Sequence, residues 1–181
     1  AISNGVLTYT DSTLTVQPAA STTVITCPTS VTYTGSAQTP CTAAVTGAGG
    51  LNTTTTVTYG NNTNAGTATA SATYAGDANH TGSTATQVTF TIAQASSSTV
   101  INCPASVTYT GSAQTPCTAA VTGAGGLNTT TTVTYGNNTN AGTATADATY
   151  AGDANHTGST ATQVTFTIAK ANQTLTYSGD Y

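Results

Sequence analysis

The feature that most constrains this 181-residue chain is an internal repeat. At an offset of 76 residues, positions 24–95 align with positions 100–171. Four of these 72 positions differ, and they are Thr26/Asn102, Thr29/Ala105, Ser71/Asp147 and Gln94/Lys170. The period is too long for one turn of a solenoid and suits one small domain per copy. We therefore expect two copies of a single module.

Alternating residues within each copy predict β-strands. Residues 67–74 place three alanines and Tyr74 on one face, and threonines and Ser71 on the other. The second copy has Asp147 in place of Ser71, as expected of a face that meets water. Residues 31–33, 57–59 and 88–92 alternate in the same way. These short runs predict sheets with one buried and one exposed face.

Composition and turn signals agree with an all-β fold. The chain has 49 threonines, which favour strands, and neither Glu nor Arg, which favour helices. Stretches rich in Gly, Asn and Asp separate the runs, as is typical of turns. They lie at residues 34–40, 46–52, 60–66 and 75–82. Short strands at this spacing predict two-sheet sandwiches.

We expect partial modules on both sides of the two copies. Residues 1–20 resemble the closing hairpin of a preceding module, and residues 172–181 resemble the opening strand of a following one, with Leu175 and Tyr177 inward. Residues 21–96 and 97–171 are then the two complete modules. An isolated hairpin or strand cannot bury its apolar face alone. The chain is accordingly expected to be a window on a longer array, or to pair its end strands with those of neighbouring copies.

The run "AGTATASATYAGDANHTGSTATQVTFTIA", preceded by "SVTYTGSAQTP" and "VTGAGG", resembles bacterial Ig-like repeat domains of the group 3 or MBG type. The resemblance covers both copies and, more weakly, both ends. It implies tandem immunoglobulin-like β-sandwiches in a long surface or secreted protein, such as a stalk, adhesin or fibre. It implies no catalytic residues. The cysteines depart from this family's pattern.

Each copy has two cysteines 14 residues apart, Cys27 with Cys41 and Cys103 with Cys117. They flank a strand, a turn and the start of the next strand, so a disulfide within each copy is expected. Zinc is the alternative, but it needs closely spaced cysteines or several histidines, and the chain has two His. Disulfides imply an oxidising location, hence an extracellular or cell-surface protein.

The loops "GDANHTG" provide candidate contact residues for a partner: Asp77, His80, Asp153 and His156. One carboxylate per loop is few for a calcium site. No Ser or Cys stands out as a nucleophile beside these His and Asp pairs. We therefore expect a plain turn, no metal, no cofactor and no enzymatic activity.

Seven Asn-x-Ser/Thr sequences are candidate glycosylation acceptors, at Asn52, Asn61, Asn79, Asn128, Asn137, Asn155 and Asn172. Chance predicts four or five in a chain so rich in Ser and Thr, so their number alone decides nothing. Glycans on a surface this poor in charge would add solubility.

One Lys and five Asp are the only charged residues. A nucleic-acid partner is not expected, because phosphate binding needs a basic patch. Membrane insertion of this segment is not expected either, since no apolar run approaches about 18 residues.

Repetition of one module favours mechanics over chemistry. We expect a structural segment of an extracellular fibre or surface stalk, whose partners are copies of itself or adjacent modules, with strand sharing at its ends as one mode of assembly. The alternative is a module of a bacterial adhesin that binds a glycan or a host protein. A remote alternative is an ice-binding surface formed by the threonine rows, although strand twist opposes the flat lattice that it requires.

Overall fold

The computed structural model describes residues 15–179. The first copy of the repeat contains β1 (Ser21–Thr26), β2 (Ser30–Thr32), β3 (Thr42–Gly47), η1 (Ala48–Gly50), β4 (Leu51–Thr54), β5 (Val57–Gly60), β6 (Gly66–Gly76), β7 (Thr81–Thr84) and β8 (Val88–Ala93). The second contains β9 (Ser97–Asn102), β10 (Ser106–Thr108), β11 (Thr118–Gly123), η2 (Ala124–Gly126), β12 (Leu127–Thr131), β13 (Val133–Gly136), β14 (Gly142–Gly152), β15 (Thr157–Thr160) and β16 (Val164–Ala169). No α-helix occurs between residues 15 and 179, and the predicted all-β class is confirmed.

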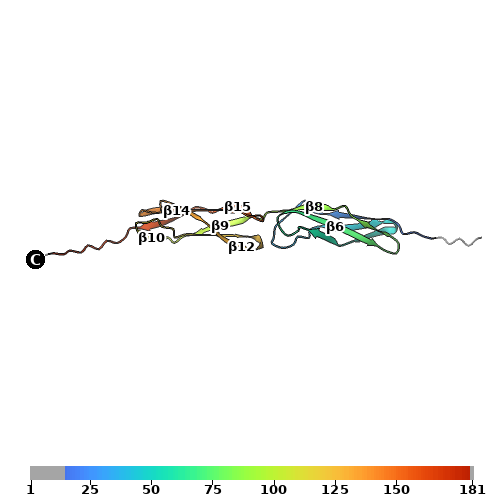
Figure 1. Ribbon diagram of the computed structural model, residues 1–181, viewed down its shortest axis with the longest axis horizontal. Helices are drawn as coiled ribbons and strands as arrows, with labels where there is room; N and C mark the ends of the chain where they lie inside the picture. The colour runs from blue at the N-terminus through green and yellow to red at the C-terminus, as the bar shows by residue number, and fades with distance from the viewer. Residues whose placement is uncertain (1–14, 180–181) are drawn as a thin grey trace, which may run out of the picture. The chain divides into compact units, whose positions relative to one another are not determined.

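The strands of each copy form two sheets (Figure 1). In the second copy, β9 and β12 flank β11 in a three-stranded antiparallel sheet. The other sheet has the order β10-β16-β14-β13, and β15 pairs with the end of β14. The first copy has the same strand order, β1-β3-β4 and β2-β8-β6-β5, with β7 on β6. The pairs β2/β8 and β10/β16 are parallel.

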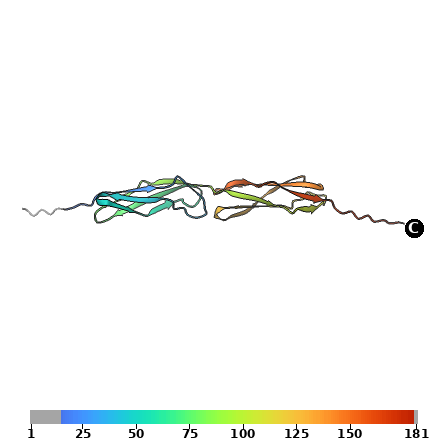
Figure 2. The ribbon, with the colours of Figure 1, turned by 180° about the vertical axis from the view of Figure 1, so that it is seen from behind.

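The second copy is a sandwich of these two layers, seen from behind in Figure 2. Ala144, Ala146 and Ala148 of β14 are buried with Phe166 and Ile168 of β16. Ile101 and Ala119 from the three-stranded sheet belong to the same cluster. The predicted period-two faces are thus confirmed for β14 and β16. In the first copy, Ala68, Ala70, Ala72, Phe90 and Ile92 are buried in the same way.

Strand register explains the disulfides. In the antiparallel pair of β9 and β11, Asn102 lies opposite Thr118, so the next residue outward on each strand is a cysteine. Cys103 and Cys117 are bonded, with their Cα atoms 4.3 Å apart. Cys27 and Cys41 are bonded likewise, so both predicted disulfides are present. They indicate an oxidising environment.

The chain divides into two compact units. One contains Cys41–Thr58 and Ala70–Val88 together with the described residues before Cys27. The other contains Cys27–Pro40, Tyr59–Thr69 and the described chain from Thr89 onward. The second unit thus holds the whole second copy and three segments of the first, the last of which begins at Thr89.

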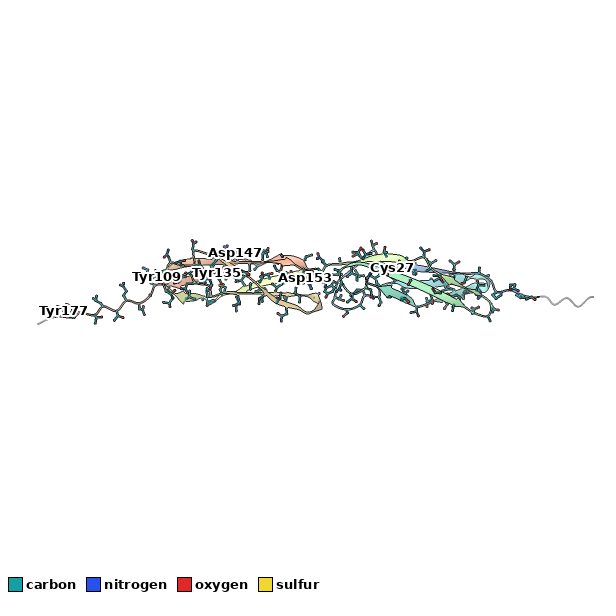
Figure 3. The ribbon with its side chains drawn as sticks, in the orientation of Figure 1. Cys27, Tyr109, Tyr135, Asp147, Asp153 and Tyr177 are labelled. Atoms are coloured by element: carbon teal, nitrogen blue, oxygen red, sulfur yellow. A yellow bond between two sulfur atoms is a disulfide. The ribbon has the colours of Figure 1, made fainter. Side chains whose placement is uncertain are left out.

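Residues 1–14 and 180–181, which belong to the two partial modules expected from the sequence, lie outside the described residues. Residues 170–179 belong to no described strand. Leu175 and Tyr177 are 97% and 89% exposed, and Figure 3 shows Tyr177 on the segment that leaves the second sandwich. No helix of the described chain is both long and apolar enough to cross a membrane.

Candidate functional site: the Asp-Asn-His loop

A tight loop joins β14 to β15 and contains Asp153, Asn155 and His156. The Asp153 amide donates to the His156 carbonyl oxygen at 3.0 Å. One carboxylate oxygen of Asp153 accepts from the amides of Asn155 and His156, both at 2.7 Å. Gly152 enters the loop at φ 93°, and a Cβ there would lie 2.7 Å from the His156 carbonyl oxygen. Only glycine fits this turn, and Gly76 precedes the first copy's loop at φ 91°.

The histidine of the loop faces an acceptor at each ring nitrogen. Nδ1 of His156 lies 2.9 and 3.0 Å from the carboxylate oxygens of Asp153, and Nε2 lies 2.8 Å from the Ala124 carbonyl oxygen. Only a protonated imidazole donates from both nitrogens. In the first copy, His80 bonds Asp77 and the Ala48 carbonyl oxygen with nearly the same distances.

These contacts shift the pKa values of the loop. The hydrogen bond to the Ala124 carbonyl, supported by Asp153, raises the pKa of His156 above its usual 6.5. The Tyr150 hydroxyl donates to Asp153 at 2.8 Å and is the main cause that lowers the pKa of Asp153 to about 2. The first copy shows the same shifts, with Tyr74 acting on Asp77 and the Ala48 carbonyl on His80. The loop therefore favours an ion pair.

The loop also holds the segment that enters the sandwich. Ala95, which precedes β9, forms a parallel bridge with His156. Its amide donates to the Asn155 carbonyl oxygen, and its carbonyl accepts from the Thr157 amide, both at 2.9 Å. Ala19 is bonded in the same way to the loop that contains His80. Each loop thus fixes the entering chain to the edge of its own sandwich.

Within the second unit, the outer side of this loop is covered. The rings of His156 and Tyr33 meet edge to face with centroids 5.3 Å apart. Oδ1 of Asn155 accepts from the Ala65 amide at 2.9 Å, and its Nδ2 donates to Asn64 Oδ1 at 3.3 Å. These contacts form what we call the joint.

Two further contacts complete the joint. Nε2 of Gln94 donates to the Asp153 carbonyl oxygen at 2.7 Å. Gly35 and Gly125 approach so closely that a Cβ on Gly35 would lie 2.3 Å from the Cα atom of Gly125. Both glycines have positive φ, so side chains are excluded here by space and by conformation.

The structure brings each predicted pair of loop residues together, Asp77 with His80 and Asp153 with His156. Sequence reasoning did not find Tyr33, Gly35 and Asn64 as contacts of the loop. Their counterparts in the second copy, Tyr109, Gly111 and Asn140, are the same residue types, so none of the three distinguishes the joint. The one sequence difference at the joint is Gln94, whose counterpart in the second copy is Lys170.

The sequon asparagines lie mainly on the surface. Six are exposed, and they are Asn52, Asn61, Asn79, Asn128, Asn137 and Asn172. Asn155 is half-buried in the joint. Between residues 15 and 179, no three or more His, Cys, Asp or Glu residues gather at a place that could hold a metal ion.

A surface hollow of about 330 Å³ lies beside β14 in the second copy. It is lined by Asn137, Asn138, Thr139, Asn140, Ala141, Gly142 and Thr143. The first copy has an equivalent hollow of about 410 Å³ at residues 61–67, two of which bond Asn155 in the joint. Amide and hydroxyl groups dominate both hollows, so they suit polar ligands.

No protein-family model matches the chain, and neither does any curated protein.

Proposed function

We propose that the chain is a structural segment of an extracellular fibre or cell-surface stalk, made of tandem immunoglobulin-like sandwiches. The observation that carries the proposal is the bonded linker. Ala95 is hydrogen-bonded on both sides to the loop of the second sandwich, and Gln94 bonds the same loop. A stretching force on the chain would thus act on these hydrogen bonds and on the disulfide-bridged sheet that begins with β9. It would not simply extend a flexible linker.

Two-layered, all-β copies with one bridge each support the immunoglobulin-like assignment. The bridge joins neighbouring strands of one sheet, whereas antibody domains bridge their two sheets. The assignment therefore rests on the layers and on the sequence resemblance, and the disulfide supports only the oxidising, extracellular setting.

Strand sharing is the mode of assembly that we propose for residues 172–179. In repeat register, Leu175 and Tyr177 correspond to Thr99 and Ile101, which are buried in β9. A strand with this pattern would complete the three-stranded sheet of another module by adding to its edge. Replacing Leu175 with Asp should then weaken assembly, measured by sedimentation, because a carboxylate cannot enter a sandwich core unpaired.

Glycan or protein binding at the hollow of residues 137–143 is the second candidate, favoured by its amide lining. A glycan array probed with the whole chain separates the two functions. A structural segment should bind no glycan above background. Glycan binding would contradict our proposal and support the adhesin function if Asn140→Ala abolishes it. The control variant Asn52→Ala, on an exposed strand, should then leave the binding intact.

A further inference from the structure

Each copy has a counterpart of one side of the joint that none of the described residues covers. The face that covers the His156 loop in the joint is formed by Tyr33, Gly35, Asn64, Ala65 and Gln94. In the second copy the same positions are Tyr109, Gly111, Asn140, Ala141 and Lys170. We call this second set the open face. Only the last of the five positions differs between the two copies.

Described residues leave the open face uncovered. Tyr109 is 38% exposed, whereas Tyr33 contacts His156. A Cβ on Gly111 would meet only the Tyr109 hydroxyl, at 3.9 Å, whereas the same atom on Gly35 would collide with Gly125. The hollow of residues 137–143 lies on this face. A surface with the residues and shape of an occupied joint is thus available.

No residue between 15 and 179 covers the matching loop on the first copy. Asn79, the counterpart of Asn155, is exposed, and its side chain makes no hydrogen bond within residues 15–179, although its amide donates to Asp77 Oδ1 at 2.7 Å. A Cβ on Gly49, the counterpart of Gly125, would meet no atom within 4 Å. His80 Nδ1 is already hydrogen-bonded to the Asp77 carboxylate, and the Ala19 amide already donates to the Asn79 carbonyl oxygen. The loop is therefore preformed for docking.

We propose that the open face docks the Asp77–His80 loop of a second copy of this chain. The joint then recurs between molecules: Asn79 bonds Ala141 and Asn140, and His80 meets Tyr109 edge to face. Lys170, in the place of Gln94, presents an ammonium group to the Asp77 end of the loop, which carries a carboxylate. The inference rests on the proposed structural function and names its partner surface.

Such contacts are heterologous, so each docked copy presents the same open face to the next copy. Residues 170–179 belong to no described strand, which lets this segment give way to the Pro18 and Ala19 segment of the incoming molecule. One ring contact and a few hydrogen bonds make a small interface, for which we expect a Kd on the order of 1 mM. Within a fibre, the effective concentration of a neighbouring module would exceed this Kd, so the contact would be largely formed.

Sedimentation velocity of the whole chain over a wide concentration range tests the inference. The wild-type sedimentation coefficient should rise with concentration. Asn79→Ala should weaken association about tenfold, since it removes two intermolecular hydrogen bonds and none within the loop. The matched variant Asn155→Ala, which alters the occupied joint, should associate like the wild type.

Two outcomes overturn the inference. One is a wild-type chain that stays monomeric at millimolar concentration, and the other is association that Asn79→Ala leaves unchanged. If Leu175→Asp abolishes association while Asn79→Ala does not, strand sharing drives assembly and the proposed structural function stands without the docking face. Retained association in Leu175→Asp, with loss in Asn79→Ala, supports the docking face.

Discussion

At each loop, one proton decides how many hydrogen bonds the histidine can donate. Protonated His156 donates to Asp153 and to the Ala124 carbonyl, and neutral His156 must give up one of them. The ionisable groups that face it are Asp153 and the edge-on Tyr33, with Tyr150 behind Asp153. The sequence shows the Asp and His in one turn, but the carbonyl partner lies 32 residues away and follows only from the fold.

Stability should accordingly fall as the pH rises above neutrality. Folding raises the pKa of both histidines, so their contribution is complete below about 6.5 and is lost as the pH rises through the raised values. Folding lowers the pKa of Asp77 and Asp153 to about 2, so their contribution is complete above about 3.8 and is lost as the pH falls toward 2. Thermal unfolding between about pH 6 and about pH 9 should show a decreasing midpoint.

The double variant His80→Gln/His156→Gln is the control for this pH dependence. Its midpoint should be lower than that of the wild type at about pH 6 and nearly constant up to about pH 9. A wild-type midpoint that stays level or increases over the same interval would contradict protonated histidines that donate from both ring nitrogens in the folded state.

At the scale of the strand, period-two alternation in the sequence was the main basis for predicting which residues are buried. The buried alanines of β6 and β14 follow directly from the run "TATASATY" and its second copy. The parallel pairing of β2 with β8 could not be predicted, because alternation in so short a strand indicates neither its partner nor its direction. Long-range pairing of such short strands depends on the whole sandwich.

Ile168 and Val100 test the assigned faces of two strands. Ile168 on β16 is 1% exposed, so Ile168→Ala should lower the free energy of unfolding by about 2 to 5 kcal/mol. Val100 on β9 is 61% exposed, so Val100→Ala should change it by less than about 0.5 kcal/mol. Urea unfolding measures both, and equal effects would contradict the sandwich register.

The disulfide is the second test at this scale. Cys103 and Cys117 close a loop with a separation of 14 residues across neighbouring strands. Replacing both with Ser should reduce stability by about 3 kcal/mol in the chain-entropy model. The measurement is urea unfolding beside an exposed control, Thr108→Ser. An unchanged midpoint would show that the bridge adds nothing to the fold.

For the whole molecule, the repeat in the sequence indicates two like modules but not which loops meet. Both copies contain the same loop and nearly the same covering residues. Yet the loop at Asp153–His156 is covered by Tyr33 and Asn64, while the one at Asp77–His80 lacks such contacts in the described chain. Identical sequence in different surroundings cannot be resolved by residue type, so the joint required the structure.

Immunogold electron microscopy of the native material, isolated without refolding, tests the central claim most directly. If the chain is a structural segment, gold directed against it should mark filaments or stalks at regular intervals along their length. Label found only at the tips of surface structures, or on dispersed molecules attached to none, would contradict the structural function.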